Sequence, residues 1–237
     1  MINLDEKEIL TFDCYGTLID WETGIKRSIS SMFVNQKLQD SEILHLFAET
    51  EHRVQTEYPK MSYENVLKEV ITRIGKKLSQ DKSEEEEKSF SQGVKNWLPF
   101  DDTVGALKRL SKKFKLVIIS NIDKSTIEVT KKHLVVDFYQ TYTAEEIGAY
   151  KPDHKVFKYV FDKFEKYGYG VNQVLHVAES LYHDHVPAKN MGFDSVWINR
   201  RINKTGPGAS PNVGDRWIPE KQFPDLISFA NWALDLS

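Results

Sequence analysis

A carboxylate stands where the first apolar run of the chain ends. The run Ile9 to Phe12 is followed at once by Asp13, and then by Gly16 and Thr17. A glycine permits a tight turn, and the amides of such a turn point at whatever the carboxylate binds. Asp13 is therefore well placed to act as a nucleophile. Taken alone, the segment is better explained as an ordinary strand-ending turn.

Three later segments carry polar residues at similar positions. They are Ser120 and Asn121 after the run 116–119, Lys151 before Pro152, and Glu179 and Asp184 after the run 174–177. A hydroxyl and an amide can hold an oxyanion or a carboxylate by hydrogen bonds, and an ammonium can neutralise one. All four segments fall at predicted carboxyl ends of strands, so we expect their side chains to meet in one site. As a set they favour catalysis over turn formation.

The elements that would position these side chains form a parallel sheet. Strands are predicted at 9–12, 116–119, 174–177 and 195–198, and helices at 102–112, 125–133, 154–166 and 225–236. The apolar runs do not alternate with polar residues, which is typical of strands that are buried on both faces. This order predicts an α/β fold with a doubly wound, Rossmann-like sheet, which binds ligands beyond the carboxyl ends of its strands. The Gly-, Pro- and Asn-rich tail 203–224 is predicted to be irregular.

The stretch between the first two predicted strands is about 80 residues long, far more than a crossover connection needs. It has helical patterns at 41–55, 62–78 and 84–96 and no convincing strand. We therefore predict a helical cap domain inserted after the first strand. The predicted boundaries are 21–98 for the cap, and 1–20 together with 99–237 for the core.

Composition excludes several kinds of partner. The 237 residues carry a net charge of −3, which gives no long-range attraction to nucleic acid or to an anionic membrane. No apolar run approaches the roughly 20 residues that span a bilayer. The polar start MINLDEKEIL and the single cysteine, Cys14, predict a cytoplasmic protein without an intrachain disulfide. We expect a small-molecule substrate, and the apolar faces of the cap helices are compatible with a homodimer.

Taken in order, the four polar segments resemble the four motifs of the haloacid dehalogenase superfamily. These are an Asp-x-x-x-Thr nucleophile loop, a Ser or Thr after the second strand, a Lys, and an acidic pair after the fourth strand. The resemblance spans Ile9 to Asn199 and is specific as a set. It implies a hydrolase in which Asp13 forms a covalent intermediate that water hydrolyses at the carboxyl carbon. Lys151 and Ser120 would position and neutralise Asp13, and Asp184 would orient Lys151 or the water.

Tyr15 indicates which branch of this superfamily the sequence resembles. Phosphatase members carry a second Asp two residues after the nucleophile, and a Tyr, with a reference pKa of about 10, is a poor acid or base at neutral pH. The Asp-x-Tyr-Gly-Thr form instead resembles the 2-haloacid dehalogenases, which need no metal or other cofactor. The match is incomplete, because residues 47–49 lack the Arg that contacts the halide in those enzymes. In addition, Glu179, Leu181 and Phe157 stand where those enzymes have Ser, Asn and Tyr.

Two longer strings are similar to those of azetidine-2-carboxylate hydrolases, a dehalogenase-like group that opens a strained four-membered ring by the same carboxylate attack. They are FDCYGTLIDWETG at 12–24 and AESLYHDH at 178–185. The resemblance implies cleavage of a carbon–halogen or carbon–nitrogen bond in a small carboxylate. Substrate contacts are then expected from Tyr15, Thr17, Asn121 and His183.

Two alternatives stay open. In a Mg²⁺-dependent phosphatase, Asp13, Glu179, Asp184 and the backbone carbonyl of Tyr15 would hold the metal, since Mg²⁺ prefers oxygen ligands. In a catalytically silent binding protein the fold would be retained without turnover, because fold alone does not fix function. The histidines around Asp184 lack partners at zinc-site spacing, so no zinc site is predicted.

Overall fold

A parallel sheet forms the centre of the molecule. The computed structural model describes residues 2–204, 208–210, 213–214 and 217–235. The described residues form six parallel strands in the order β3-β2-β1-β4-β5-β6. Their bounds are β1 Ile9–Phe12, β2 Lys115–Ser120, β3 Gln140–Thr143, β4 Val174–Ala178, β5 Ser195–Ile198 and β6 Gln222–Phe223. The chain adds β2 and β3 on one side of β1 and then β4, β5 and β6 on the other side. Ligands bind at this switch point in sheets of this kind.

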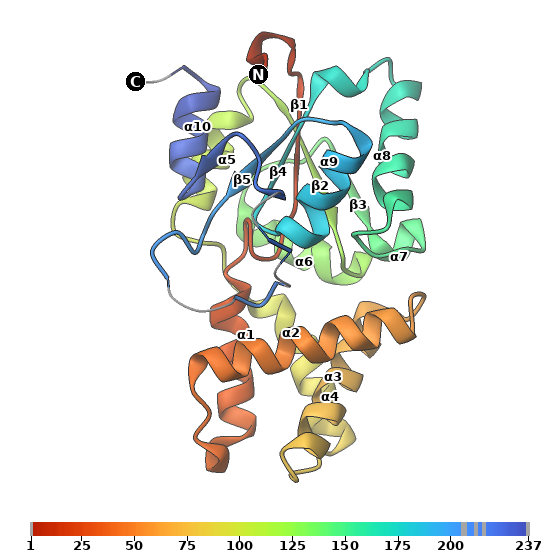
Figure 1. Ribbon diagram of the computed structural model, residues 1–237, viewed down its shortest axis with the longest axis vertical. Helices are drawn as coiled ribbons and strands as arrows, with labels where there is room; N and C mark the ends of the chain where they lie inside the picture. Colours follow the sequence, from red (N-terminus) through yellow and green to blue (C-terminus); the bar gives the residue numbers. More distant parts are fainter. Residues whose placement is uncertain (1, 205–207, 211–212, 215–216, 236–237) are drawn as a thin grey trace.

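Helices cover both faces of this sheet (Figure 1). The helices are α5 Thr103–Leu110, α6 Lys124–Leu134 and α10 Leu226–Ala233 on one face, and α7 Ala144–Ile147, α8 His154–Lys166 and α9 Val186–Met191 on the other. Leu10 and Phe12 pack into the first layer with Leu107, whereas Ile9 packs into the second with Phe157. Strands with apolar side chains on both faces need this double cover. The predicted doubly wound α/β fold is confirmed.

Four further helices lie beyond the carboxyl ends of the strands, at the bottom of Figure 1. They are α1 Trp21–Met32, α2 Asp40–Glu57, α3 Tyr63–Lys77 and α4 Glu84–Gly93. Asp20 begins the first of them, because its side chain accepts a hydrogen bond from the amide of Thr23. This layer corresponds to the predicted helical insertion, and its exact division from the core at residues 20 and 98 stays a prediction.

The two layers are joined by hydrogen bonds around the start of α3. The carboxylate of Asp123, which lies just before α6, accepts from the amides of Tyr63 at 2.9 Å and Glu64 at 2.7 Å. These two amides belong to the first turn of α3, where backbone N–H groups lack partners within the helix. The hydroxyl of Tyr150 donates to the carbonyl of Met61 at 2.7 Å. These bonds join the core to the start of α3, and the ion pair between Arg201 and Glu22 of α1 is a further contact between the layers.

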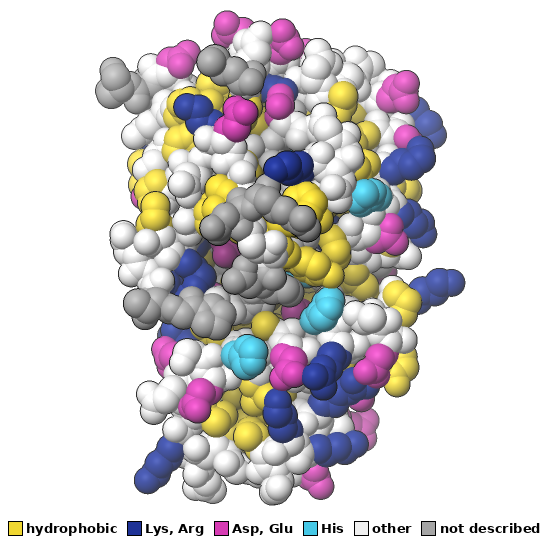
Figure 2. All heavy atoms as spheres, viewed as in Figure 1, with side chains coloured by type: hydrophobic (Ala, Val, Ile, Leu, Met, Phe, Trp, Pro, Cys, Tyr) yellow, Lys and Arg dark blue, Asp and Glu magenta, His cyan; other side chains and the backbone are white. Residues whose placement is uncertain are grey.

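The outer surface shows no separation of charge by sign on the face in view. Figure 2 shows Lys and Arg side chains interspersed with Asp and Glu side chains over both layers. Within the described part of the chain, no helix combines the length and the apolar character that crossing a membrane requires.

One prediction about the tail was wrong. Residues 222–223, within the segment expected to be irregular, form β6 and pair with Trp197 and Ile198 of β5. Phe223 packs against Phe229 and Trp232 of α10, so a short aromatic contact fixes this edge strand. The rest of the segment 203–224 is partly outside the described residues.

Candidate active site

The loop after β1 presents Asp13 to the space between the two layers. The amide of Asp13 still donates to the carbonyl of Val177, at 3.1 Å, so the residue is fixed at the end of the sheet. Gly16 has a φ of +98°, and a Cβ atom there would lie 2.9 Å from Nε1 of Trp21. The turn therefore requires glycine for its conformation and for space. Thr17, fully buried, donates its hydroxyl proton to Oδ2 of Asp13 at 2.7 Å.

Lys151 joins the two acidic residues of the site. Its ammonium donates to Oδ1 of Asp13 at 2.8 Å, to Oδ1 of Asp184 at 2.7 Å and to the carbonyl of Ile119 at 3.1 Å. An ammonium has three protons to donate, so these partners use all of them. All three charged side chains are buried. This cluster is the central feature of the site.

Burial and charge act in opposite directions on these groups. Burial raises the pKa of Asp13, and the nearby carboxylate of Asp184 adds to this, whereas Lys151 acts to lower it. Burial alone would raise the pKa of Asp184, but the ammonium of Lys151 and a hydrogen bond from His176 bring it below the usual range. The two carboxylates raise the pKa of Lys151 in spite of its burial. Lys151 and Asp184 therefore form a stable ion pair beside the less acidic Asp13.

A buried chain of hydrogen bonds supports Asp184 from behind. Nε2 of His176 lies 2.9 Å from Oδ1 of Asp184, and its Nδ1 lies 2.9 Å from the hydroxyl oxygen of Thr11. Thr11 of β1 and His176 of β4 lie directly opposite each other in these two neighbouring strands. Oδ2 of Asp184 is buried and accepts no hydrogen bond from the described residues.

Asn121 holds the backbone around Lys151. Its Oδ1 accepts from the amide of Lys151 at 2.7 Å, and its Nδ2 donates to the carbonyl of the same residue at 3.0 Å. Asn121 is predicted to contact substrate. In the structure its side chain hydrogen-bonds to the backbone of Lys151 and so positions that residue. Ser120, the last residue of β2, is buried and lines the adjacent cavity.

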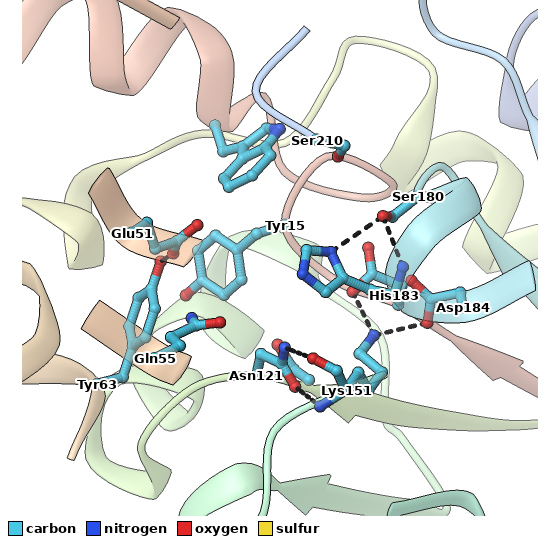
Figure 3. Close-up of a pocket in the computed structure, with 13 residues that line it drawn as sticks. Tyr15, Glu51, Gln55, Tyr63, Asn121, Lys151, Ser180, His183, Asp184 and Ser210 are labelled. Carbon is cyan, nitrogen blue, oxygen red and sulfur yellow. Dashed lines mark hydrogen bonds and ion pairs between the residues drawn. The ribbon is translucent and has the colours of Figure 1, made fainter. Parts of the chain in front are cut away.

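A cavity between the layers contains most of the predicted residues. It has an empty volume of about 460 Å³, its opening to solvent included. Among the predicted residues, those that line it are Asp13, Tyr15, Ser120, Asn121, Lys151, His183 and Asp184 (Figure 3). The lining does not include Thr17, which lies behind Asp13, or Glu179. Glu179 instead accepts from the hydroxyl of Ser210, and burial raises its pKa to about 8.

The sequence analysis did not identify the other lining residues. They are Trp21, Glu51, Gln55, Tyr63, Ser180 and Ser210. Four of them come from the cap layer, where no motif marks a site. One signal was present for Glu51, since it falls on the same helical face as Phe47 and Val54, both buried. A charged residue on an apolar face is unusual and points to a specific role.

Two of the ring side chains that line the cavity, those of Tyr15 and His183, are neutral. Burial raises the pKa of Tyr15 well above its ordinary value, and its hydroxyl lies 2.7 Å from that of Thr130. Burial lowers the pKa of His183 to about 4, and its Nδ1 lies 3.0 Å from the hydroxyl of Ser180. The Ser180 hydroxyl also accepts from the amide of His183, at 3.1 Å. These rings can orient a ligand but are poorly suited to take up a proton at neutral pH.

A magnesium ion does not fit the site as it stands. Within the described ranges, no three His, Cys, Asp or Glu side chains are grouped so that they could hold a metal ion. The ammonium of Lys151 lies between the two carboxylates and supplies the positive charge that a cation would otherwise provide. Mg²⁺ needs a full set of oxygen ligands, which the single unpartnered Oδ2 of Asp184 cannot supply. The metal set of Asp13, Tyr15, Glu179 and Asp184 stays a prediction.

Comparison with known proteins places the chain in a family. The family model described as haloacid dehalogenase-like hydrolase matches residues 10–198. The Rhythmically expressed gene 2 protein of Drosophila melanogaster is 22% identical to the chain, over 97% of the chain and 96% of that protein.

Several solved structures share the fold. An L-2-haloacid dehalogenase from Xanthobacter autotrophicus with chloropropionic acid covalently bound has a TM-score of 0.79 and 16% identity, over 98% of this chain and 100% of that one. A HAD-hydrolase from Bacillus subtilis bound to magnesium has a TM-score of 0.74 and 16% identity, over 96% of this chain and 99% of that one. At these identities the likeness concerns the fold.

The parallel sheet, the helical layer over its carboxyl edge and the family match agree with one another. The chain belongs to the haloacid dehalogenase-like hydrolase family. Its fold is shared with L-2-haloacid dehalogenases of known structure.

Proposed function

We propose that the chain hydrolyses a small carboxylate through a covalent ester of Asp13, with cleavage of a carbon–halogen or carbon–nitrogen bond. The observation that carries the proposal is the buried carboxylate of Asp13 at 2.8 Å from Lys151, at the wall of a small cavity. Tyr15 supports it, because its neutral ring stands where a phosphatase would need a second carboxylate. The Xanthobacter autotrophicus structure of the same fold has chloropropionic acid covalently bound, which supports a covalent intermediate.

In the first step, a carboxylate oxygen of Asp13 bonds to the saturated carbon next to the substrate carboxylate. The bond from that carbon to the leaving group breaks, and its electron pair goes to the leaving atom. Lys151 and Thr17 hold the two oxygens of Asp13, which fixes the direction of attack. Ser120 and the amides of the nucleophile loop are proposed to hold the substrate carboxylate.

In the second step, water attacks the carboxyl carbon of the Asp13 ester and releases a hydroxy acid. The oxygen that Asp13 donated leaves with the product, and a water oxygen takes its place in the side chain. Asp184 is proposed to orient this water through Oδ2, which accepts no hydrogen bond from the described residues. His176 and Lys151 hold Asp184 in place through Oδ1.

A single turnover in heavy-oxygen water tests this mechanism. With enzyme in excess over 2-chloropropionate or azetidine-2-carboxylate, we expect the label in the Asp13 carboxylate, measured by mass spectrometry of the peptide that contains it. Asp13→Asn should abolish turnover, and the surface variant Asp162→Asn is the control, because its partner Lys158 is exposed. Label that appears in the product alone would rule out an Asp13 ester.

A magnesium-dependent phosphatase is the second candidate, suggested by the magnesium-bound Bacillus subtilis structure of the same fold, and it would require Lys151 to move from its place between the two carboxylates. It predicts phosphate release from small phosphate esters that a chelator abolishes and magnesium restores. The lead proposal predicts that a small carboxylate substrate is hydrolysed at a rate that a chelator does not change.

A further inference from the structure

Glu51 is a buried acid on the cap side of the cavity. It belongs to α2, is 6% exposed and lines the cavity that contains Asp13. Its Oε1 accepts from the hydroxyl of Tyr63 at 2.6 Å, and no described residue donates to its other oxygen. In Figure 3, Glu51 and Tyr63 lie on one side of the pocket, Lys151 and Asp184 on the other, and the ring of Tyr15 between them.

No cation of the described cavity lining is available to Glu51. Among the described residues that line the cavity, Lys151 is the one lysine or arginine. Its three protons are donated to Asp13, Asp184 and a backbone carbonyl. His183 is neutral, because burial lowers its pKa to about 4. Buried acids in proteins are normally paired with a cation. Within the described part of the chain, Glu51 therefore has no charge partner.

Packing does not account for an acid at this position. Glu51 lies one turn beyond Phe47 and one turn before Val54, both fully buried in the same apolar cluster. An apolar side chain there would complete the cluster, whereas an acid loses its hydration. Tyr63, which comes from the first turn of α3, orients Glu51 by a hydrogen bond. The residue is held toward the cavity by a second cap helix.

We infer that Glu51 binds a protonated amine of the substrate, so that the substrate class is a small amino or imino acid. The inference rests on the proposed function, and it extends it to the leaving group. The substrate carboxylate would lie toward Ser120 and the ammonium toward Glu51, with the carbon under attack between them. Glu51 is then the specificity-determining residue of the cap.

The ammonium also gives the chemistry a leaving group. When an Asp13 oxygen bonds to the carbon, the carbon–nitrogen bond breaks and its electron pair neutralises the positive nitrogen, which leaves as an amine. Water then hydrolyses the ester, as above, and its proton is taken up by the amine. Net, one water is added and no oxidant, reductant or further reactant is needed. By holding the nitrogen in its protonated form, Glu51 favours departure of a neutral amine.

A matched pair of ligands tests this inference by binding alone. Azetidine-2-carboxylate carries a ring ammonium, and oxetane-2-carboxylate has a ring oxygen in the same place. In the Asp13→Asn protein, which cannot form the ester, calorimetry should show roughly tenfold to hundredfold tighter binding of the azetidine, as a charge-assisted hydrogen bond supplies. Equal binding of the two ligands, or no binding of the azetidine, would overturn the inference.

Variants of α2 locate the preference. Glu51→Gln, made in the Asp13→Asn background, keeps an acceptor for Tyr63 and should remove the preference for the azetidine. Glu49→Gln removes the same charge from the same helix outside the cavity lining, and should keep it. A preference that survives Glu51→Gln would assign the ammonium to another group. The ligand comparison without Glu51 variants remains decisive if Glu51→Gln does not fold.

The pH dependence of azetidine binding is a second readout. Burial raises the pKa of Glu51 to about 7, so the group becomes fully charged only at higher pH. Affinity should rise between about pH 6 and pH 8 and then level off, and Glu51→Gln should flatten the rise. Among the lining groups, burial keeps the pKa of Tyr15 and Tyr63 well above this range and that of His183 below it. Glu179, which lies behind Ser210, has a pKa raised to about 8, so the flattening in Glu51→Gln is what assigns the rise to Glu51. Asp184 is likewise ionised throughout, because Lys151 lowers its pKa.

The two proposals can fail separately. Label in Asp13 from 2-chloropropionate, together with equal binding of the azetidine and the oxetane, would leave the ester mechanism standing and remove the role of Glu51. A clear azetidine preference without any label in Asp13 would do the reverse.

Discussion

At the scale of single residues, the site depends on one ammonium placed between two carboxylates. Lys151 contacts Asp13 and Asp184 at 2.8 and 2.7 Å and is almost completely buried. Buried charges of this kind are stable only when every partner is present. The side chain of Asn121 fixes the backbone of Lys151 at both its amide and its carbonyl. The position of Lys151 is therefore determined by the sheet and not by the ligand.

Replacing Lys151 by Met should damage the site and the fold together. The change leaves two buried carboxylates without their counterion, which costs about 3–5 kcal/mol in the free energy of unfolding. Loss of the positive charge of Lys151 beside Asp13 should also lower kcat by about a hundredfold or more. Without Lys151 the pKa of Asp13 rises further, so the residual activity should need a higher pH than in the wild type.

Urea unfolding and a pH profile of hydrolysis measure these effects. Lys155→Met is the matched control, because this lysine is exposed and donates only to the carbonyl of Gly148 at 3.4 Å. A folded Lys151→Met protein with the wild-type rate and pH profile would contradict the proposed role.

Sequence reasoning identified the core half of the site and missed the cap half. Asp13 and Asp184 follow strands, and Lys151 precedes a helix, whose positions can be read from apolar runs, so their meeting at one sheet edge was predictable. Glu51 and Tyr63 lie on cap helices whose packing against the core has no sequence rule. Their contact with the cavity required the relative placement of the two layers.

At the scale of elements, the nucleophile loop depends on the conformation of one residue. Gly16 lies in the left-handed region, and its Cα faces the indole of Trp21, the first residue of α1. The loop therefore links the nucleophile to the start of the cap. Arg200 adds support from below by donating to the carbonyl of Thr17 at 2.8 Å.

Gly16→Ala should lower both stability and activity. A Cβ atom would be strained by the positive φ and would collide with Nε1 of Trp21, and together these should cost about 1–3 kcal/mol in the free energy of unfolding. Displacement of Asp13 should reduce turnover further. Gly105→Ala is the control, because a Cβ atom at this position in α5 meets nothing within 4 Å and alanine favours a helix by up to about 1 kcal/mol.

Thermal unfolding and single-turnover rates of both variants measure the difference. An active, fully stable Gly16→Ala protein would show that the loop tolerates another backbone conformation.

The elements that were missed share a physical reason. β3, with the sequence QTYT, lies at the edge of the sheet and has no continuous apolar run. α1 buries only Trp21, Ile25 and Ile29, a stripe too narrow to stand out in a polar segment. β1, β2 and β4 lie in the centre of the sheet, and their apolar runs predicted them well. Burial on both faces is thus what made the central strands visible in the sequence.

At the scale of the whole molecule, the cavity exists because the cap is held over the sheet edge. Two cap side chains in the lining, Glu51 and Tyr63, meet the core residues only in this arrangement. Asp123 accepts two amide hydrogen bonds from the first turn of α3, and Tyr150 donates to the carbonyl of Met61 just before it. A negative charge at a helix N-terminus is favourable in itself, since it meets the positive end of the helix dipole. Asp123 and Tyr150 therefore make one of the polar contacts that hold the cap over the core.

Asp123→Ala should loosen this docking without unfolding the cap. The amides of Tyr63 and Glu64 lose their acceptor, so their hydrogen exchange should become faster, and the free energy of unfolding should fall by about 1–2 kcal/mol. Because the cap contributes Glu51 and Tyr63 to the cavity, KM for a small substrate should rise more than kcat falls. Tyr150→Phe removes one neighbouring hydrogen bond to the same segment and should give a smaller change in the same direction. Unchanged exchange at Tyr63 and Glu64 would mean that α3 is held by its apolar packing alone.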